Sequence, residues 1–233
     1  MTTGRRLQEA AVADPGWNGA LKALAELLAA GRPDARARVV LSHHFAPVYL
    51  LPATPVRLSH AELLGWARER LVSQFGESAR NWQLVAQAEP PGDPFLVSTL
   101  PPERLSELDA VLATAGVRAI GLQPWLAVAC NRYRASLGRG TAWLALAEPG
   151  RLTLARMQGG RFRALRSALT GPDPVRDLAD MMARESLLEA EGTQGPVWLS
   201  NMHVPGSWQA LAGRIELRQL GPAEQGMAAM LGT

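Results

Sequence analysis

TAWLALAEPGRLTLARMQGGRFRALRS, residues 141–167, carries the clearest structural pattern in the chain. It contains three apolar runs, at 141–147, 152–157 and 161–165, which Pro149-Gly150 and Gly159-Gly160 separate. Short apolar runs joined by glycine-containing turns are typical of neighbouring antiparallel strands. We therefore predict a three-stranded antiparallel meander here.

The segments after this meander alternate between helix and strand patterns. We predict a helix at about 174–191, a strand at 197–200, a short helix near 207–212, a strand at 215–220 and a terminal helix. Strands that alternate with helices pair in parallel through crossover connections. The order βββαβαβα thus predicts an α/β fold with a mixed sheet covered by helices, and we assign residues 139–233 to one domain.

The segments before the meander form a second domain, residues 1–138, with an inserted hairpin. The predicted helices are 21–30, one beginning near His60, one from Pro102 to Gly116, and about 124–137; the predicted strands are 38–45, 47–51, 81–88, 95–100 and 117–122. Ser59 and Glu62 form the capping-box pattern of a helix start, and Gly76 ends that helix. Pro90-Pro91-Gly92-Asp93 indicates the turn of the hairpin.

Composition restricts the function classes. Among 233 residues, 47% are hydrophobic and 19% charged, and the formal net charge is only +3. We find no long basic stripe, so we expect no nucleic-acid partner. Cys130 is the single cysteine, which excludes an intrachain disulfide and a zinc site of several cysteines. No run approaches the ~20 apolar residues that span a bilayer, so we expect no direct membrane insertion.

The element order resembles the ribonuclease-H-like unit, two of which in tandem make the actin-like ATPase fold. Residues 39–52 (VVLSHHFAPVYLLP), 100–134 (LPPERLSELDAVLATAGVRAIGLQPWLAVACNRYR) and the meander look like the actin-like assembly proteins of bacterial machines. These are the PilM family of type IV pili and the cytoplasmic part of the type II secretion L proteins. The similarity covers roughly residues 21–220 and implies tandem units of which the first is incomplete.

The resemblance also locates the positions where such ATPases hold phosphate. They use two glycine-containing hairpin turns, and the first should precede the helix at 21–30, where residues 1–17 show no strand pair. The second falls on Glu148, Pro149 and Gly150, and proline lacks the N–H that a phosphate would need. The adenine-side turn, at 200–206, has no Gly-Gly pair. The resemblance therefore implies a member that has lost ATP and magnesium binding.

The role that remains is a non-catalytic scaffold at the cytoplasmic face of a pilus or secretion machine. We expect it to bind the cytoplasmic segment of a membrane-anchored assembly protein, in a groove between the halves or at a strand edge. It would be cytoplasmic, peripheral to the bacterial inner membrane through that partner, and a homodimer stays open. Trp66 and Arg70 on the helix after Ser59 are the predicted partner contact, with packing of Trp66 in the core as the alternative.

Two catalytic alternatives also remain. Glu148, Glu185 and His203 could hold metal ions in a ribonuclease-H-like nuclease, because acidic residues converge on divalent metals in that class. A residual actin-like ATPase, with an unrecognised segment in place of its first hairpin, is the other. His43 and His44 are predicted on a strand, where adjacent side chains point to opposite faces, so we expect no metal site on that pair.

Overall fold

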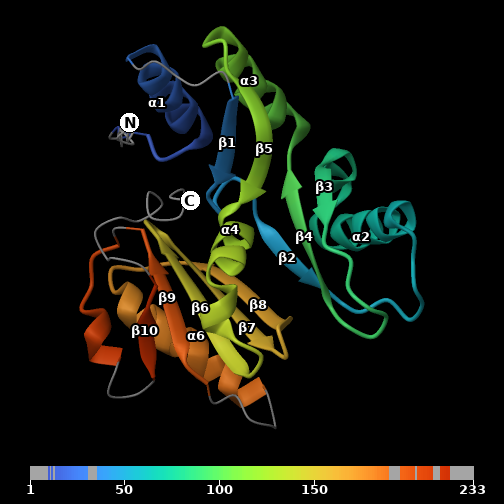
Figure 1. Ribbon diagram of the computed structural model, residues 1–233, viewed down its shortest axis with the longest axis vertical. Coiled ribbons are helices and arrows are strands. Elements are labelled where there is room, and N and C mark those ends of the chain that lie inside the picture. Colours follow the sequence, from blue (N-terminus) through green and yellow to red (C-terminus); the bar gives the residue numbers. More distant parts are fainter. Residues whose placement is uncertain are drawn as a thin grey trace, which may run out of the picture.

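The computed structural model describes residues 10, 12, 14–30, 36–188, 195–202, 204–211 and 216–220. Within these residues the strands form three sheets, of two, three and five strands. Helix α4 (Trp125–Arg132) stands between the three-stranded and the five-stranded sheet, at the centre of the molecule (Figure 1).

The five-stranded sheet contains the predicted meander. Its strands β6 (Thr141–Glu148), β7 (Arg151–Gln158) and β8 (Arg161–Leu169) pair antiparallel, β9 (Val197–Asn201) pairs parallel with β6, and β10 (Leu217–Gln219) pairs parallel with β9. The order is β10-β9-β6-β7-β8. The mixed sheet that the sequence predicts is confirmed, whereas the predicted terminal helix lies outside the described residues.

Both faces of this sheet are covered, which explains the continuous apolar run of β6. Leu144 and Leu146 belong to the core cluster that includes α4, while Trp143 and Ala145 belong to the cluster of helix α6 (Pro174–Leu188). Successive strand side chains point to opposite faces, so a doubly covered strand needs apolar residues at every position. A short 3-10 helix, η2 (Trp208–Leu211), packs on the α6 side.

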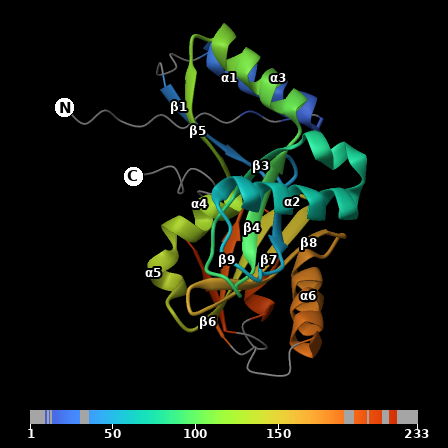
Figure 2. The same cartoon turned by 90° about the vertical axis from the view of Figure 1, so that its right-hand side faces the viewer.

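The two-stranded sheet is the smallest unit. Strands β1 (Arg36–Leu41) and β5 (Arg118–Pro124) pair in parallel. Helices α1 (Trp17–Ala30) and α3 (Pro102–Thr114) lie against one side of this sheet, through a cluster centred on Leu108, Leu112 and Val117 (Figure 2). Gly116, which ends α3 with φ 70°, adopts the left-handed conformation that glycine favours.

The three-stranded sheet has the order β2-β4-β3 and is antiparallel throughout. It consists of β2 (Val48–Leu51), β3 (Gln83–Ala86) and β4 (Phe95–Leu100), so the predicted hairpin is confirmed with a shorter first strand. Helix α2 (His60–Phe75) packs on one face, followed by the 3-10 helix η1 (Glu77–Asn81). The other face, with Val48 and Leu96, turns toward α4.

Several predicted boundaries differ from the structure, such as the start of α1 at Trp17 and the end of β8 at Leu169, and two others change the path of the chain. The strand expected through Phe45 ends at Leu41, because Ser42 O accepts the N–H groups of Phe45 and Ala46 and turns the chain; His43 and His44 therefore lie in a turn. The helix expected over 124–137 is interrupted at Tyr133 (φ −99°, ψ 15°), which separates α4 from the one-turn helix α5 (Arg134–Leu137).

The capping box at the start of α2 can be tested by mutation. Ser59 Oγ accepts the N–H of Glu62, and the Glu62 side chain accepts the N–H of Ser59. Replacing Ser59 by alanine removes the acceptor for one helix N–H, so we expect a loss of about 1 kcal/mol in the free energy of unfolding, measured by urea denaturation. Ser73→Ala, on the exposed face of the same helix, should cost nothing; equal losses in both variants would contradict the capping role.

Candidate functional site

The turn between β6 and β7 is packed against the turn that follows β1. Nε2 of His44 donates a hydrogen bond to the carbonyl of Pro149 (3.0 Å). The N–H of His43 points at the Glu148 carboxylate, 3.2 Å from each oxygen. A Cβ at Gly150 would lie 4.0 Å from Cε1 of His44, so the two turns are in direct contact. We call this the turn junction.

Glu148 lies at the centre of the turn junction, with a side chain that is 2% exposed. Burial raises the pKa of its carboxyl group, while hydrogen bonds from Ser42 and from the His43 backbone, and the charge of Arg151, act in the opposite direction. The Glu148 carboxyl group thus accepts hydrogen bonds from the Ser42 side chain and the His43 N–H. A phosphate at the same place would meet an acidic side chain and a proline without an N–H.

His43 is the second buried titratable group of the turn junction. It is 3% exposed, and its Nδ1 has no hydrogen-bond partner among the described residues. Burial lowers the pKa of its ring to about 4, helped by the charges of Arg151 and His44. The pKa of His44 is lowered as well, by burial and by Arg151, whose Nε lies 3.5 Å from its Nδ1. Both rings are therefore neutral at physiological pH.

Glu148 and Glu185, the two described residues of the nuclease alternative, do not form one site. Glu148 follows Leu144 and Leu146 on the α4 face of β6, whereas Glu185 lies on α6 at the opposite face and pairs with Arg166 (2.6 Å). His203 lies outside the described residues. The described part of the chain contains no group of three or more His, Cys, Asp or Glu side chains that could hold a metal ion.

The loop expected on the adenine side is closed on itself. The Asn201 side chain accepts the N–H of Val204 (2.9 Å) and donates to its carbonyl (3.1 Å). Val204 is buried, and its carbonyl also accepts the indole N–H of Trp208 (3.2 Å). The backbone groups of Val204 are thus engaged within the protein.

An open groove runs between β3 and helices α4 and α5. At one end is an apolar hollow of about 150 Å³, lined by Val48, Val85, Ala86, Gln87, Leu96, Ser98, Pro124, Leu126 and Ala127. At the other end is a polar hollow of about 800 Å³, lined by Gln87, Ala88, Glu89, Cys130, Asn131, Arg134, Ala135, Leu137, Gly138, Arg139, Met157, Gly159, Gly160, Arg161 and Phe162. Gln87 lines both, so we treat them as one feature, the β3 groove.

The β3 groove is bordered by a strand edge with which no other described strand pairs. β3 is the outer strand of its sheet, and Val85 is 72% exposed. Gln87 donates its N–H to Leu96 on β4 (2.9 Å), and in antiparallel pairs such bonds alternate along the strand. Leu84 and Ala86 therefore direct their backbone N–H and C=O groups away from β4.

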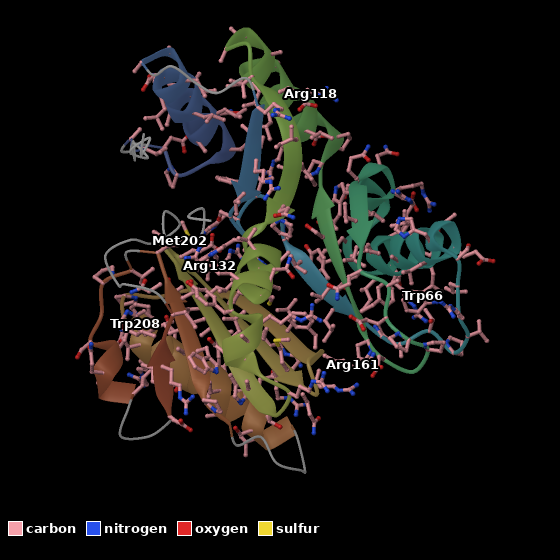
Figure 3. The ribbon with its side chains drawn as sticks, in the orientation of Figure 1. Trp66, Arg118, Arg132, Arg161, Met202 and Trp208 are labelled. Atoms are coloured by element: carbon pink, nitrogen blue, oxygen red, sulfur yellow. The ribbon has the colours of Figure 1, made fainter. Side chains whose placement is uncertain are left out.

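Salt bridges hold the β3–β4 loop against the five-stranded sheet at the polar end of the groove. Arg161 pairs with Asp93 (2.6 Å) and Glu89 (3.3 Å), and Arg163 pairs with Asp93 (2.7 Å). Figure 3 shows Arg161 at the end of the five-stranded sheet, beside this loop. The ion pairs are partly buried, so they fix one wall of the groove better than exposed pairs would.

Trp66 and Arg70 lie together on α2, as their helical spacing requires. The Arg70 guanidinium stands 4.7 Å from the centre of the Trp66 ring, which is half-buried and 5.6 Å from the ring of Phe95. α2 covers the face of the three-stranded sheet that turns away from the β3 groove (Figure 3). The pair therefore forms a separate surface.

Comparison with solved structures identifies the fold. The PilM–PilN type IV pilus biogenesis complex matches with a TM-score of 0.65 and 12% identity, over 94% of this chain and 78% of that one. The cytoplasmic domain of EpsL, an inner-membrane component of the type II secretion system of Vibrio cholerae, matches with 0.59 and 12%, over 91% and 79%. A Bacteroides thetaiotaomicron protein with an actin-like ATPase fold matches with 0.56 and 11%, over 91% and 80%.

These likenesses confirm the actin-like fold that the sequence indicated, and at such low identity they show the fold alone. A search with the sequence found no matching family model and no matching curated protein. Across the described residues, no helix is both long and apolar enough to cross a bilayer.

Proposed function

We propose that this chain, which has the actin-like fold, is a non-catalytic scaffold of a bacterial pilus or secretion assembly machine. It binds the cytoplasmic segment of a membrane-anchored assembly protein and is held at the inner membrane through that partner, on the cytoplasmic side. Nucleic acid is not among its expected partners.

The turn junction carries this proposal. At the phosphate-turn position of the actin-like fold, a buried carboxylate accepts the His43 N–H, and the Pro149 carbonyl is bonded to His44. A nucleotide phosphate would have to displace Glu148 and would meet charge repulsion there. The fold thus keeps its architecture while this turn serves as a packing contact.

The β3 groove provides the binding surface. A free strand edge beside an apolar hollow is the arrangement that receives extended peptides by strand addition. One of the neighbours of similar fold is a complex with a second pilus protein, PilN, and another is the cytoplasmic domain of an inner-membrane component. Trp66 with Arg70 is proposed as a further contact, because aromatic and arginine side chains dominate interfaces.

Thermal denaturation with ATP or ADP, each with and without Mg²⁺, tests the loss of nucleotide binding. We expect no shift of the melting temperature. A site with a Kd of roughly 10 µM would be stabilised by about 2.7 kcal/mol at a hundredfold higher nucleotide concentration, a readily measured shift. Such a shift would contradict the proposal.

Calorimetry with the cytoplasmic peptide of a pilus or secretion membrane protein encoded beside this gene tests the scaffold role. Ala127→Arg fills the apolar end of the β3 groove, so we expect it to abolish binding. Ala113→Arg, on an exposed position of α3, is the matched control and should bind as the parent does. If Arg70→Ala abolished binding while Ala127→Arg left it unchanged, the binding site would lie on α2 instead.

A further inference from the structure

We propose that the segment bound in the β3 groove is an extended peptide that adds a strand to β3 and carries acidic side chains at the arginine end of the groove. This inference rests on the proposed function and adds the chemical character of the partner. It follows from three features of the groove: its backbone edge, its change of polarity along the strand, and its unpaired charges.

The backbone edge fixes the conformation of the peptide. Leu84 and Ala86 present N–H and C=O groups at the edge of β3 that pair with no other described residue, and an added strand would satisfy both residues at once. Side chains of an added strand alternate between the two sheet faces. Every second side chain of the peptide would therefore lie on the face of Val85 and Gln87, over the start of α4.

The polarity of the groove changes along β3. Val85 lines the apolar hollow, Gln87 lines both hollows, and Glu89 lines the polar hollow. The step from Val85 to Glu89 is four residues, or about 13 Å at the rise of an extended strand. The peptide should thus place a small apolar side chain and an acidic side chain about four residues apart, on the same face.

The charges of the polar hollow are not balanced within the protein. Its lining contains three arginines, Arg134, Arg139 and Arg161, and Glu89 is its one acidic side chain. Arg161 already pairs with Glu89 and Asp93. Arg134 and Arg139 are exposed and take part in no ion pair within the described part of the chain. Two free guanidinium groups favour carboxylates, which they bind in a bidentate manner.

The test uses fluorescently labelled eight-residue peptides and fluorescence anisotropy. In one peptide, threonines occupy one strand face, and two valines followed by two glutamates occupy the other. Its counterpart has lysines in place of the glutamates. Both peptides are also made with their sequences reversed. We expect the glutamate peptide to bind more tightly than the lysine peptide by at least tenfold, the change that about one charge-assisted contact gives.

Charge reversal makes the test specific to the two arginines. The Arg134→Glu/Arg139→Glu variant should bind the lysine peptide in preference to the glutamate peptide. Arg36→Glu/Arg118→Glu changes net charge equally on paired exposed positions of β1 and β5, far from the groove, and should keep the preference of the parent (Figure 3). Thermal melts of both double variants verify folding.

Several outcomes would overturn the inference. Equal affinity for the two peptides, no binding of either, or a preference that the double variant leaves unchanged would each exclude an acidic segment at these arginines. A thymidine oligonucleotide of ten nucleotides serves as a further probe. If it bound as tightly as the glutamate peptide, and binding depended on the same two arginines, the groove would be assigned to nucleic acid instead. The proposed function fails separately, when the membrane-protein peptide does not bind at all; binding that survives Ala127→Arg would instead remove the β3 groove as its site.

Discussion

Replacing Trp125 by alanine is expected to lower the free energy of unfolding by about 3–5 kcal/mol, the largest effect of any single change considered for this protein. Trp125 is the first residue of α4 and is fully buried. It belongs to a core cluster that joins Val48 and Leu96 of the three-stranded sheet to Leu144 and Leu146 of the five-stranded sheet. Its removal would leave a cavity in this cluster, between the two sheets.

Equilibrium denaturation in urea, followed by circular dichroism, measures this effect. Trp66→Ala is the matched comparison, because the same side chain is removed from a half-buried position, and it should cost clearly less. Trp125→Phe keeps an apolar ring and should recover part of the stability. A Trp125→Ala loss no larger than that of Trp66→Ala would mean that α4 does not hold the two sheets together.

The second half of the fold could be predicted from the sequence because its signals are local. Pro149-Gly150 and Gly159-Gly160 sit at the two turns, and Gly150, Gly159 and Gly160 have φ values of 77°, 63° and 76°, which favour glycine. The sequence also predicts a mixed sheet covered by helices, and α4 and α6 cover the two faces of β6. The capping box at Ser59 and the stop at Gly76 are local in the same way.

Other features could not be predicted, because distant contacts decide them. His43 and His44 look like strand residues, yet Ser42 and the neighbouring Glu148 hold them in a turn. The hydrogen bond from His43 to Glu148 joins residues 105 apart in sequence, so no local pattern marks it. A helix pattern continues through Tyr133, and nothing in the residues nearby signals the break between α4 and α5.

The features of the candidate site also depend partly on local sequence and partly on distant contacts. The resemblance implied that Glu148, Pro149 and Gly150 stand at the phosphate-turn position, but the sequence could not show that the carboxylate is buried against His43. A partner site at a strand edge or in a groove between the halves was expected without residues for the groove, and that site stays a prediction. Arg134 and Arg139 follow α4 in a polar stretch without a recognisable motif. The Gly159 N–H donates to the Arg139 carbonyl (2.9 Å) and joins this stretch to the β7–β8 turn, where both arginines line one hollow.

The stability of the protein should fall as pH decreases from about 6.5 to about 4, by about 3 kcal/mol from His43 alone. The pKa of His43 is about 4 in the folded protein and 6.5 when unfolded, so the unfolded chain binds the proton over this range. His44, lowered in the same direction, adds to the loss. Glu148 opposes it, because a raised folded pKa means that the folded protein takes up a proton more readily on acidification.

Urea denaturation at intervals between pH 4 and pH 8 measures these slopes. His43→Phe keeps a buried ring but removes the titration, and Nδ1 makes no hydrogen bond to a described residue that the change would break, so the stability of this variant should change much less over this range. Glu148→Gln removes the opposing contribution and should make the fall steeper than in the parent. His60→Phe, on the exposed start of α2, is the control and should retain the parent slope. If His43→Phe also retains it, the turn junction does not hold a neutral imidazole, because a buried neutral ring takes up its proton on unfolding in acid, and this uptake is what makes the stability fall.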